Sequence, residues 1–184
     1  MVIDKFNFKL KDGRIATVCS PEEKDAQNMI DYLYKSAGET EFIIRYPEEC
    51  SKYTLEKEIE FINRVNNSDN EAVVVCIADE KVVGVCGISW SNNLKTKHRA
   101  RIGIAILKEF WNQGIGTVLM KEAIKIAEKN KDIIQIELDF VEGNERAKAL
   151  YEKMGFKIVG IKPNAIRLKN GTLLNEYSMI KEIR

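Results

Sequence analysis

The N-terminal part of the chain alternates apolar and polar residues with the two-residue period of half-buried strands. Residues 6–10 and 15–19 carry this pattern, with an Asp-Gly pair between them that is typical of a hairpin turn. Ser20 then has the character of a helix N-cap, a proline follows it, and Glu23 completes a capping box. We therefore expect a hairpin followed by a helix from Ser20 to about Ser36.

The rest of the chain alternates between strand-like and helix-like segments. Thr54 is placed to cap a second helix whose apolar residues recur with helical spacing. Gly155 is expected to end the last helix in the left-handed conformation that glycine favours. Further strands are predicted over 72–78, 82–90, 101–107, 133–140, 156–168 and 172–183, and further helices over 117–130 and 144–154. This order predicts a mixed α/β sheet with helices on its faces.

Composition narrows the class of protein. The 184 residues are 45% hydrophobic and 31% charged, as in an ordinary globular domain, and we expect a single domain over residues 1–184. Basic and acidic residues nearly cancel, 29 against 28, which argues against a nucleic-acid partner. No apolar run reaches the ~20 residues needed to cross a bilayer, and the N-terminus lacks the apolar core of a secretory signal. We expect a cytoplasmic protein without a membrane partner.

The cysteines and the lone histidine give no metal-site pattern. Cys19, Cys50, Cys76 and Cys86 lack close ligand spacing, and three of them lie in apolar, strand-like runs. They are interpreted as small buried residues of a reduced protein. No metal cofactor is expected.

A glycine turn before a helix is the first pattern with chemical content. The apolar strand that ends with Ile104-Ala105-Ile106 is followed after seven residues by Gly114-x-Gly116. Free amides in the first helical turn and the helix dipole favour a phosphate group there, and glycine allows the backbone to approach it. A tight turn with close packing would give the same pattern. The nucleotide-binding alternatives fit less well, because no Gly-Lys-Ser/Thr follows and Leu119 replaces the last glycine of GxGxxG.

A second pattern follows the next predicted strand. Residues 144–156 read NERAKALYEKMGF, a short helix that ends at a glycine. With residues 111–119, WNQGIGTVL, this segment closely resembles motifs A and B of the GNAT superfamily of N-acetyltransferases. The resemblance is strongest over residues 72–160, and the order of elements extends it over nearly the whole chain.

The resemblance implies a fold and a cofactor. Members have a mixed, mostly antiparallel twisted sheet of about seven strands flanked by about four helices, with two central parallel strands splayed to hold acetyl-CoA. The strand backbone would pair with the pantetheine arm, the glycine loop would bind the pyrophosphate, and Asn144 would cap its helix and contact the arm. The expected cofactor-binding residues are Ile104, Ile106, Asn112, Gln113, Gly114, Ile115, Gly116, Thr117, Asn144 and Lys153. Where the family usually has Arg or Gln, this chain has Trp111, so a basic contact would come from Lys108 or Lys153.

The resemblance makes Tyr151 the expected general acid, which would protonate the sulfur of coenzyme A as it leaves. A core aromatic beside Leu150 is the alternative interpretation. Glu137 is the candidate base, and Asp139 shares its strand face, although a surface or ion-paired role fits both carboxylates equally well. His98, as an alternative base, and Glu41, as a contact for a cationic acceptor, are weaker candidates.

The leading prediction is direct transfer of an acetyl group from acetyl-CoA to a primary amine within a ternary complex. No cysteine or serine lies in a nucleophile context, which argues against an acetyl-enzyme. The acceptor stays open among protein N-termini, lysines, polyamines, amino acids and aminoglycosides. A catalytically silent acyl-CoA-binding module and a different phosphate-ligand enzyme are the alternatives. The terminal strands offer an edge for a homodimer, which the sequence leaves open.

Overall fold

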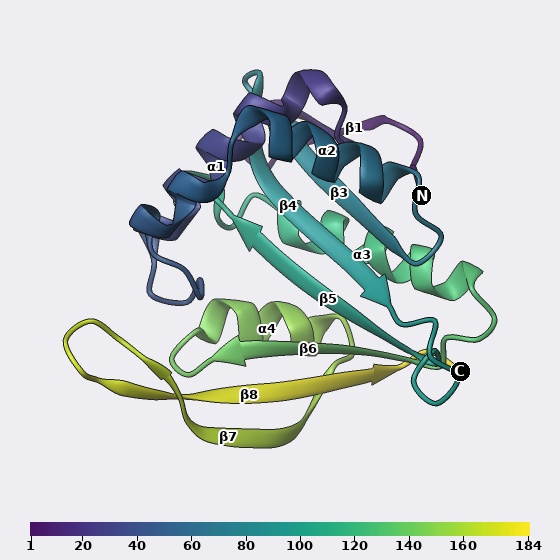
Figure 1. Cartoon of the computed structure of the whole chain (residues 1–184), viewed down its shortest axis with the longest axis vertical. Coiled ribbons are helices and arrows are strands. Elements are labelled where there is room, and N and C mark those ends of the chain that lie inside the picture. Colours follow the sequence, from purple (N-terminus) through teal and green to yellow (C-terminus); the bar gives the residue numbers. More distant parts are fainter.

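The computed structural model describes residues Met1–Arg184 and places one eight-stranded mixed sheet at the centre of the molecule. The strands are β1 (Phe6–Lys9), β2 (Ile15–Cys19), β3 (Glu71–Ala78), β4 (Lys81–Trp90), β5 (Arg99–Ile106), β6 (Gln135–Val141), β7 (Lys157–Arg167) and β8 (Leu173–Glu182). The helices are α1 (Ala26–Glu39), α2 (Leu55–Asn66), α3 (Ile115–Lys129) and α4 (Glu145–Lys153). The strand order is β1-β2-β3-β4-β5-β6-β8-β7 (Figure 1). The predicted mixed, mostly antiparallel sheet is confirmed, because only the β5–β6 pair is parallel.

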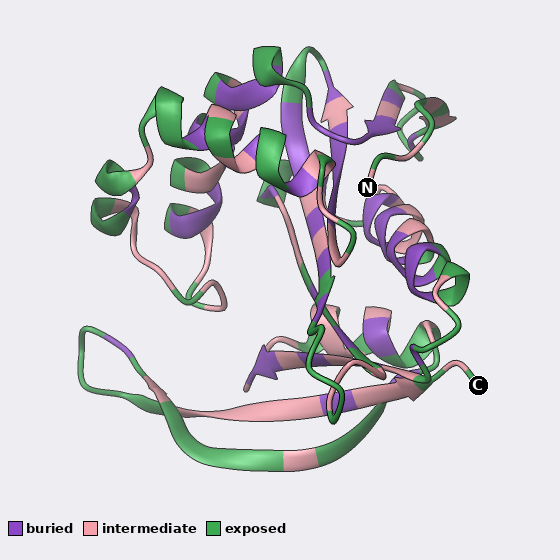
Figure 2. Ribbon diagram, turned by 45° about the vertical axis from the view of Figure 1, so that its right-hand side comes forward, coloured by how far each residue is buried: buried purple, intermediate pink, exposed green.

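Helices cover the sheet on both faces. α1 and α2 pack against each other on one face of β3 and β4, and α3 lies on the other (Figures 1 and 2). α4 is on the side of α3, since a Cβ atom on Gly116 would stand 2.8 Å from Leu150. β3 and β4 are covered on both faces, and Figure 2 shows them as the most continuously buried strands. This explains why their sequences are almost uninterrupted runs of apolar residues.

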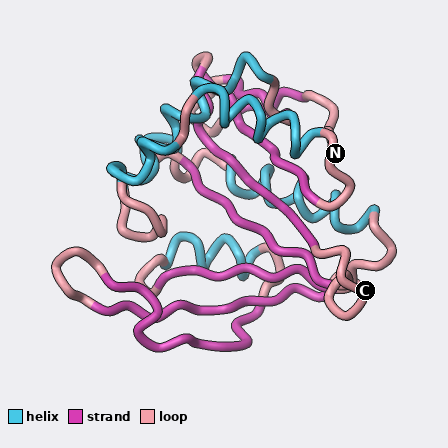
Figure 3. The backbone as a smooth tube through the Cα atoms, viewed as in Figure 1, coloured by secondary structure: helices cyan, strands magenta, loops and turns pink.

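The parallel pair β5–β6 is joined over only three residue pairs, from Arg99↔Gln135 to Arg101↔Glu137. Beyond that point the strands separate, although β5 continues to Ile106 beside β4 and β6 continues to Val141 beside β8. Figure 3 shows the two strands close together near the C-terminus and wide apart at their other ends. The sheet therefore contains a V-shaped gap in its middle, as the resemblance implied.

One predicted helix start is wrong. The Ser20 side chain does not cap α1 but accepts a hydrogen bond from the Ile3 amide, 3.0 Å away. A short 3₁₀ turn, Glu23–Asp25, precedes the helix instead, and Asp25 accepts a hydrogen bond from the Glu22 amide at 2.8 Å. The Ser20 hydroxyl, which the local sequence pattern predicts to cap the helix, is thus occupied by the N-terminal segment. Thr54, by contrast, caps α2 as predicted, with its hydroxyl oxygen accepting from the Lys57 amide.

α4 ends as predicted, in a Schellman motif. Gly155 has a φ of +88°, its amide donates to the Glu152 carbonyl, and the Phe156 amide donates to the Tyr151 carbonyl. The rings of Phe156 and Tyr151 pack with centroids 6.3 Å apart, which supplies the hydrophobic contact that accompanies this motif. The glycine therefore fixes the helix turn that carries Tyr151.

β7 forms one edge of the sheet, and the side chains of Ile158, Val159 and Ile161 on it are exposed. The expected homodimer edge stays a prediction. No helix is both long and apolar enough to cross a membrane.

Replacing Gly155 by alanine should destabilise the fold by about 1–2 kcal/mol, because the left-handed conformation is unfavourable for an L-residue. Gly160→Ala is the matched control: it lies in β7 without a positive φ, and no atom lies within 4 Å of the position that a Cβ would take. Urea unfolding of both variants would measure the difference. Equal stability of Gly155→Ala and wild type would contradict this account of the helix end.

Candidate active site

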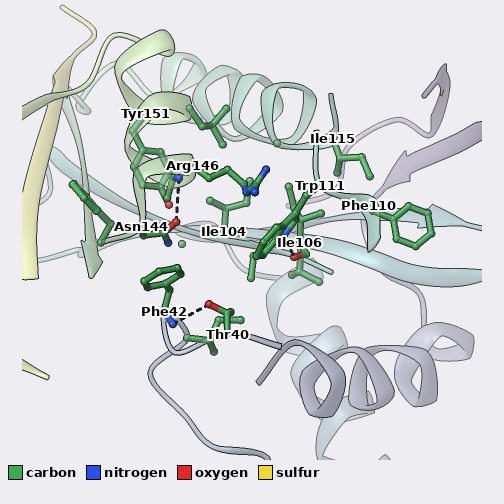
Figure 4. Close-up of a pocket in the computed structure, with 18 of the residues that line it drawn as sticks. Thr40, Phe42, Ile104, Ile106, Phe110, Trp111, Ile115, Asn144, Arg146 and Tyr151 are labelled. Atoms are coloured by element: carbon green, nitrogen blue, oxygen red, sulfur yellow. Dashed lines mark hydrogen bonds between the residues drawn. The ribbon is translucent and has the colours of Figure 1, made fainter. Parts of the chain in front are cut away.

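A cavity of about 970 Å³ occupies the gap between β5 and β6. Its walls come from β5, the loop before α3, the first turn of α3, the end of β6, α4, and the segment after α1. Figure 4 shows Thr40 and Phe42 on one side of it and Asn144 and Tyr151 on the other. Ten predicted site residues line it: Ile104, Ile106, Asn112, Gly114, Ile115, Gly116, Thr117, Asn144, Tyr151 and Lys153.

The register of the strands shows that the cavity opens on both faces of the sheet. Gly84 faces α3, since a Cβ there would contact Ile115 and Leu119, and its cross-strand partner Ile106 faces the same way. Arg101 is an odd number of residues from Ile106 and therefore faces α1 and α2. Its ion-pair partner Asp139 lines the cavity from that face. The cavity thus passes through the sheet.

The two glycines before and within α3 serve different purposes. Gly114 has a φ of +92° with open space where a Cβ would stand, so it makes the turn and leaves the helix N-terminus accessible. A Cβ on Gly116 would instead stand 2.8 Å from Leu150 and 3.3 Å from Ile106. Gly116 therefore allows α4 and β5 to approach α3. Close packing therefore explains Gly116, whereas the approach of a phosphate to the loop at Gly114 stays a prediction.

Trp111 holds the loop against β5 and makes a cation–π contact with Arg146. Its indole Nε1 donates a 2.8 Å hydrogen bond to the Ile106 carbonyl, and the Arg146 guanidinium lies 4.2 Å from the ring centroid (Figure 4). Arg146 also donates to the Asn112 side-chain oxygen at 2.7 Å. Arg146 of α4 therefore places a positive charge beside the glycine loop, where the sequence predicted one from Lys108 or Lys153. Lys153 lines the cavity, whereas Lys108 does not.

Asn144 caps α4. Its side-chain oxygen accepts a hydrogen bond from the Ala147 amide at 3.2 Å, and the residue lines the cavity. An asparagine that caps with its oxygen keeps its amide NH₂ group as a donor. The N-cap interpretation is thus correct and leaves that group for a ligand.

Tyr151 lies between two aromatic rings at the end of the cavity nearest β6. Its ring centroid is 6.2 Å from that of Phe140 and 6.3 Å from that of Phe156, and the residue is 6% exposed. Burial raises the pKa of its phenol. The hydroxyl therefore keeps its proton at neutral and mildly alkaline pH, the state that a proton donor requires.

The two carboxylates of β6 are separated by the shape of the gap. Asp139 lines the cavity, accepts a 2.6 Å hydrogen bond from the Ser178 hydroxyl and pairs with Arg101. Glu137 lies nearer the joined end of the strands, does not line the cavity, and contacts Gln135 and Arg99. Periodicity put both carboxylates on one face, as observed, but could not show where β5 leaves β6.

The remaining predicted residues lie elsewhere. The His98 carbonyl accepts from the Ile134 amide where β5 and β6 begin to pair. Glu41 is exposed and does not line the cavity. The Gln113 side-chain oxygen accepts from the Asp12 amide, and Gln113 does not line the cavity. No group of three or more His, Cys, Asp and Glu side chains is placed to hold a metal ion.

Two residues of this site carried no sequence signal. The Tyr32 hydroxyl of α1 donates a 2.9 Å hydrogen bond to the Ala105 carbonyl, which ties α1 to β5 beside the cavity. Arg45 lines the cavity from the segment after α1. Neither belongs to a local motif, and both reach the site only through the tertiary fold.

Comparisons with known proteins agree with this arrangement. Residues 31–156 match the model of the acetyltransferase (GNAT) family. L-amino acid N-acetyltransferase AaaT of Escherichia coli K12 is 31% identical over 109 residues, which are 59% of this chain and 66% of that protein. A GNAT-family acetyltransferase from Streptococcus pneumoniae is 27% identical, with a TM-score of 0.85 over 91% of this chain and 99% of its own. The fold of yncA from Salmonella typhimurium, solved with its cofactor acetyl-CoA, has a TM-score of 0.77 at 13% identity, over 92% and 94% of the two chains. Because the family model covers most of the chain, the protein belongs to the GNAT acetyltransferase family.

Proposed function

We propose that the protein transfers the acetyl group of acetyl-CoA to a primary amine. The observation that carries this proposal is the cavity through the sheet, with an accessible helix N-terminus on one face and a carboxylate, Asp139, on the other. Two reactants can then meet from opposite faces in the gap between β5 and β6. The names of the relatives support N-acetylation, and AaaT makes an amino acid one of the acceptors to test.

The residues that line the α3 side fit acetyl-CoA. The first-turn amides of α3 have no partner within the helix and, with Lys153 and Arg146, offer positive charge to the pyrophosphate. β5 beyond Arg101 has no partner strand on the β6 side, so its backbone can pair with an amide-containing chain such as pantetheine. The free NH₂ group of Asn144 adds a further donor. Acetyl-CoA supplies the activated acyl group.

The reaction is a single acyl transfer. The amine nitrogen attacks the thioester carbonyl carbon, the C–N bond forms, the C–S bond breaks, and the nitrogen loses a proton while the thiolate gains one. Tyr151, kept protonated by burial, gives its proton to the departing sulfur. Asp139 lies on the acceptor side and takes the proton from the amine, the role that the sequence pattern favoured for Glu137.

The state of the cysteines supports direct transfer without an acetyl-enzyme. All four are buried, and none lines the cavity. Burial raises the pKa of the Cys76 and Cys86 thiols to about 12, so their nucleophilic thiolate forms are scarce at neutral pH.

Tyr151→Phe should lower kcat by about 10²-fold or more while leaving the Kd for acetyl-CoA unchanged, because only the proton donor is lost. The measurement is thiol release from acetyl-CoA across a panel of amino acids, N-terminal peptides, lysine peptides, polyamines and aminoglycosides, with calorimetry for binding. Tyr177→Phe is the matched control, since its ring stacks 5.2 Å from Phe140 outside the cavity. The raised pKa of Tyr151 also predicts no alkaline loss of its proton up to about pH 10.

Two outcomes would contradict this account. Full activity of Tyr151→Phe would remove the phenol from the mechanism. Binding of acetyl-CoA without release of thiol for any amine would favour the silent acyl-CoA-binding module.

Asp139→Asn should lower kcat/KM for the acceptor by at least about tenfold, whereas Glu137→Gln should stay within about twofold of wild type. The reason is position: both carboxylates are on one strand face, but only Asp139 lines the cavity. Acceptor titrations at saturating acetyl-CoA would measure this, with thermal unfolding to confirm that both variants fold. The reverse ranking would return the role to Glu137.

A further inference from the structure

The wall of the cavity opposite the α3 side has an unusual composition. It consists of residues from α1 and from the segment that follows it, namely Tyr32, Leu33, Thr40, Phe42, Ile43, Ile44 and Arg45. Apolar and aromatic side chains dominate this set, and Arg45 is its only charged member. Because this wall carries no carboxylate, Asp139 and Glu145 are the only acidic residues that line the cavity, against four basic ones, which is unfavourable for an acceptor with several positive charges. Polyamines, aminoglycosides and lysine-rich peptides therefore fit it poorly.

Arg45 lacks the partners that other arginines near the gap possess. Arg99 and Arg101 of β5 each pair with a carboxylate of β6. The Arg45 side chain forms no ion pair of this kind, and its Nε atom is buried without a hydrogen-bond partner. Because the protein itself covers Nε, the terminal Nη groups are the donors of Arg45 that a ligand in the cavity can reach.

Glu58 of α2 lies close enough to Arg45 for the charge of Arg45 to lower the pKa of Glu58, but the two residues form no ion pair. Glu58 is 5% exposed; burial raises its pKa, and the charge of Arg45 offsets this effect only in part. The two side chains are not in salt-bridge contact, and the Arg45 guanidinium, on a residue that lines the cavity, makes no hydrogen bond within the chain.

From this wall we infer that the acceptor is a free amino acid with an apolar side chain, whose carboxylate is bound by Arg45. The inference rests on the proposed acetyl transfer. A guanidinium binds a carboxylate with paired, charge-assisted hydrogen bonds, and the two Nη groups of Arg45 have no partner within the chain that would compete with such a contact. Phe42, Ile43 and Leu33 can receive the apolar side chain. Asp139, on the same face of the sheet, remains for the amine.

The test combines removal of the carboxylate from the acceptor with removal of the charge from the protein. Thiol release is measured for L-phenylalanine, L-methionine and L-leucine, for the carboxamide of each, and for peptides that begin with these residues. Wild type, Arg45→Gln and Arg45→Lys are compared. Arg167→Gln, an exposed arginine on β7 outside the cavity, is the matched control. The KM for acetyl-CoA is measured in every variant.

Wild type should prefer the acid to its carboxamide by about tenfold to a hundredfold in kcat/KM. Arg45→Gln should lose this preference because kcat/KM falls for the acid alone, while kcat/KM for the carboxamide and the KM for acetyl-CoA stay unchanged. Arg45→Lys should retain part of it, because a lysine keeps the charge but not the planar fork. Arg167→Gln should behave as wild type.

Three results would overturn the inference: equal rates for acid and carboxamide in wild type, equal losses for both in Arg45→Gln, or a better rate with peptides or polyamines than with amino acids. Each of these leaves acetyl transfer itself intact. Silence with every amine would instead contradict the proposed function. Calorimetric titration of the coenzyme A-loaded protein with L-phenylalanine would then decide on Arg45, since binding lost in Arg45→Gln supports the inference and no binding in wild type overturns it.

Discussion

The short pairing between β5 and β6 is the constraint on which the site depends. Three residue pairs hold the strands together, after which each strand keeps a partner only on its outer side. Backbone groups that face such a gap need other partners. One side chain provides such a partner, since the Trp111 indole binds the Ile106 carbonyl, which points toward the gap. This contact secures the glycine loop to the edge of β5 from which the cavity opens, whereas the Tyr32 hydroxyl ties α1 to the Ala105 carbonyl, which points toward β4.

Features that depend on neighbours in the sequence were predictable. The Asn144 cap, the left-handed Gly155 and the Thr54 cap each involve residues no more than a few positions apart. The strands β3 and β4 were equally clear, because burial on both faces imposes a long apolar run. Two motifs in their expected order then identified the glycine loop and Tyr151 as neighbours in space, and both line the one cavity.

Features that depend on distant segments were not predictable. Ser20 has the local pattern of a helix cap, but the Ile3 amide, seventeen residues earlier, occupies its hydroxyl. Gly116 is small because Leu150 approaches it from another helix. Whether Glu137 or Asp139 reaches the cavity depends on the residue at which two strands separate, and strand periodicity contains no such information. Arg45 is a candidate only because the fold places the segment after α1 on the cavity wall.

The turn between β7 and β8 also meets the segment after α1. The Lys169 amide donates to the Tyr46 hydroxyl at 3.0 Å, its ammonium lies 4.3 Å from the Tyr46 ring centroid, and it pairs with Glu48. The gap is thus bounded at one end by the hydrogen-bonded ladder of β5 and β6, and at the other by the exposed contact of Lys169 with Tyr46 and Glu48. Exposed ion pairs of this kind contribute at most about 1 kcal/mol and weaken with added salt. Added salt is therefore expected to weaken the contact at the open end of the gap while it leaves the backbone ladder at the joined end in place.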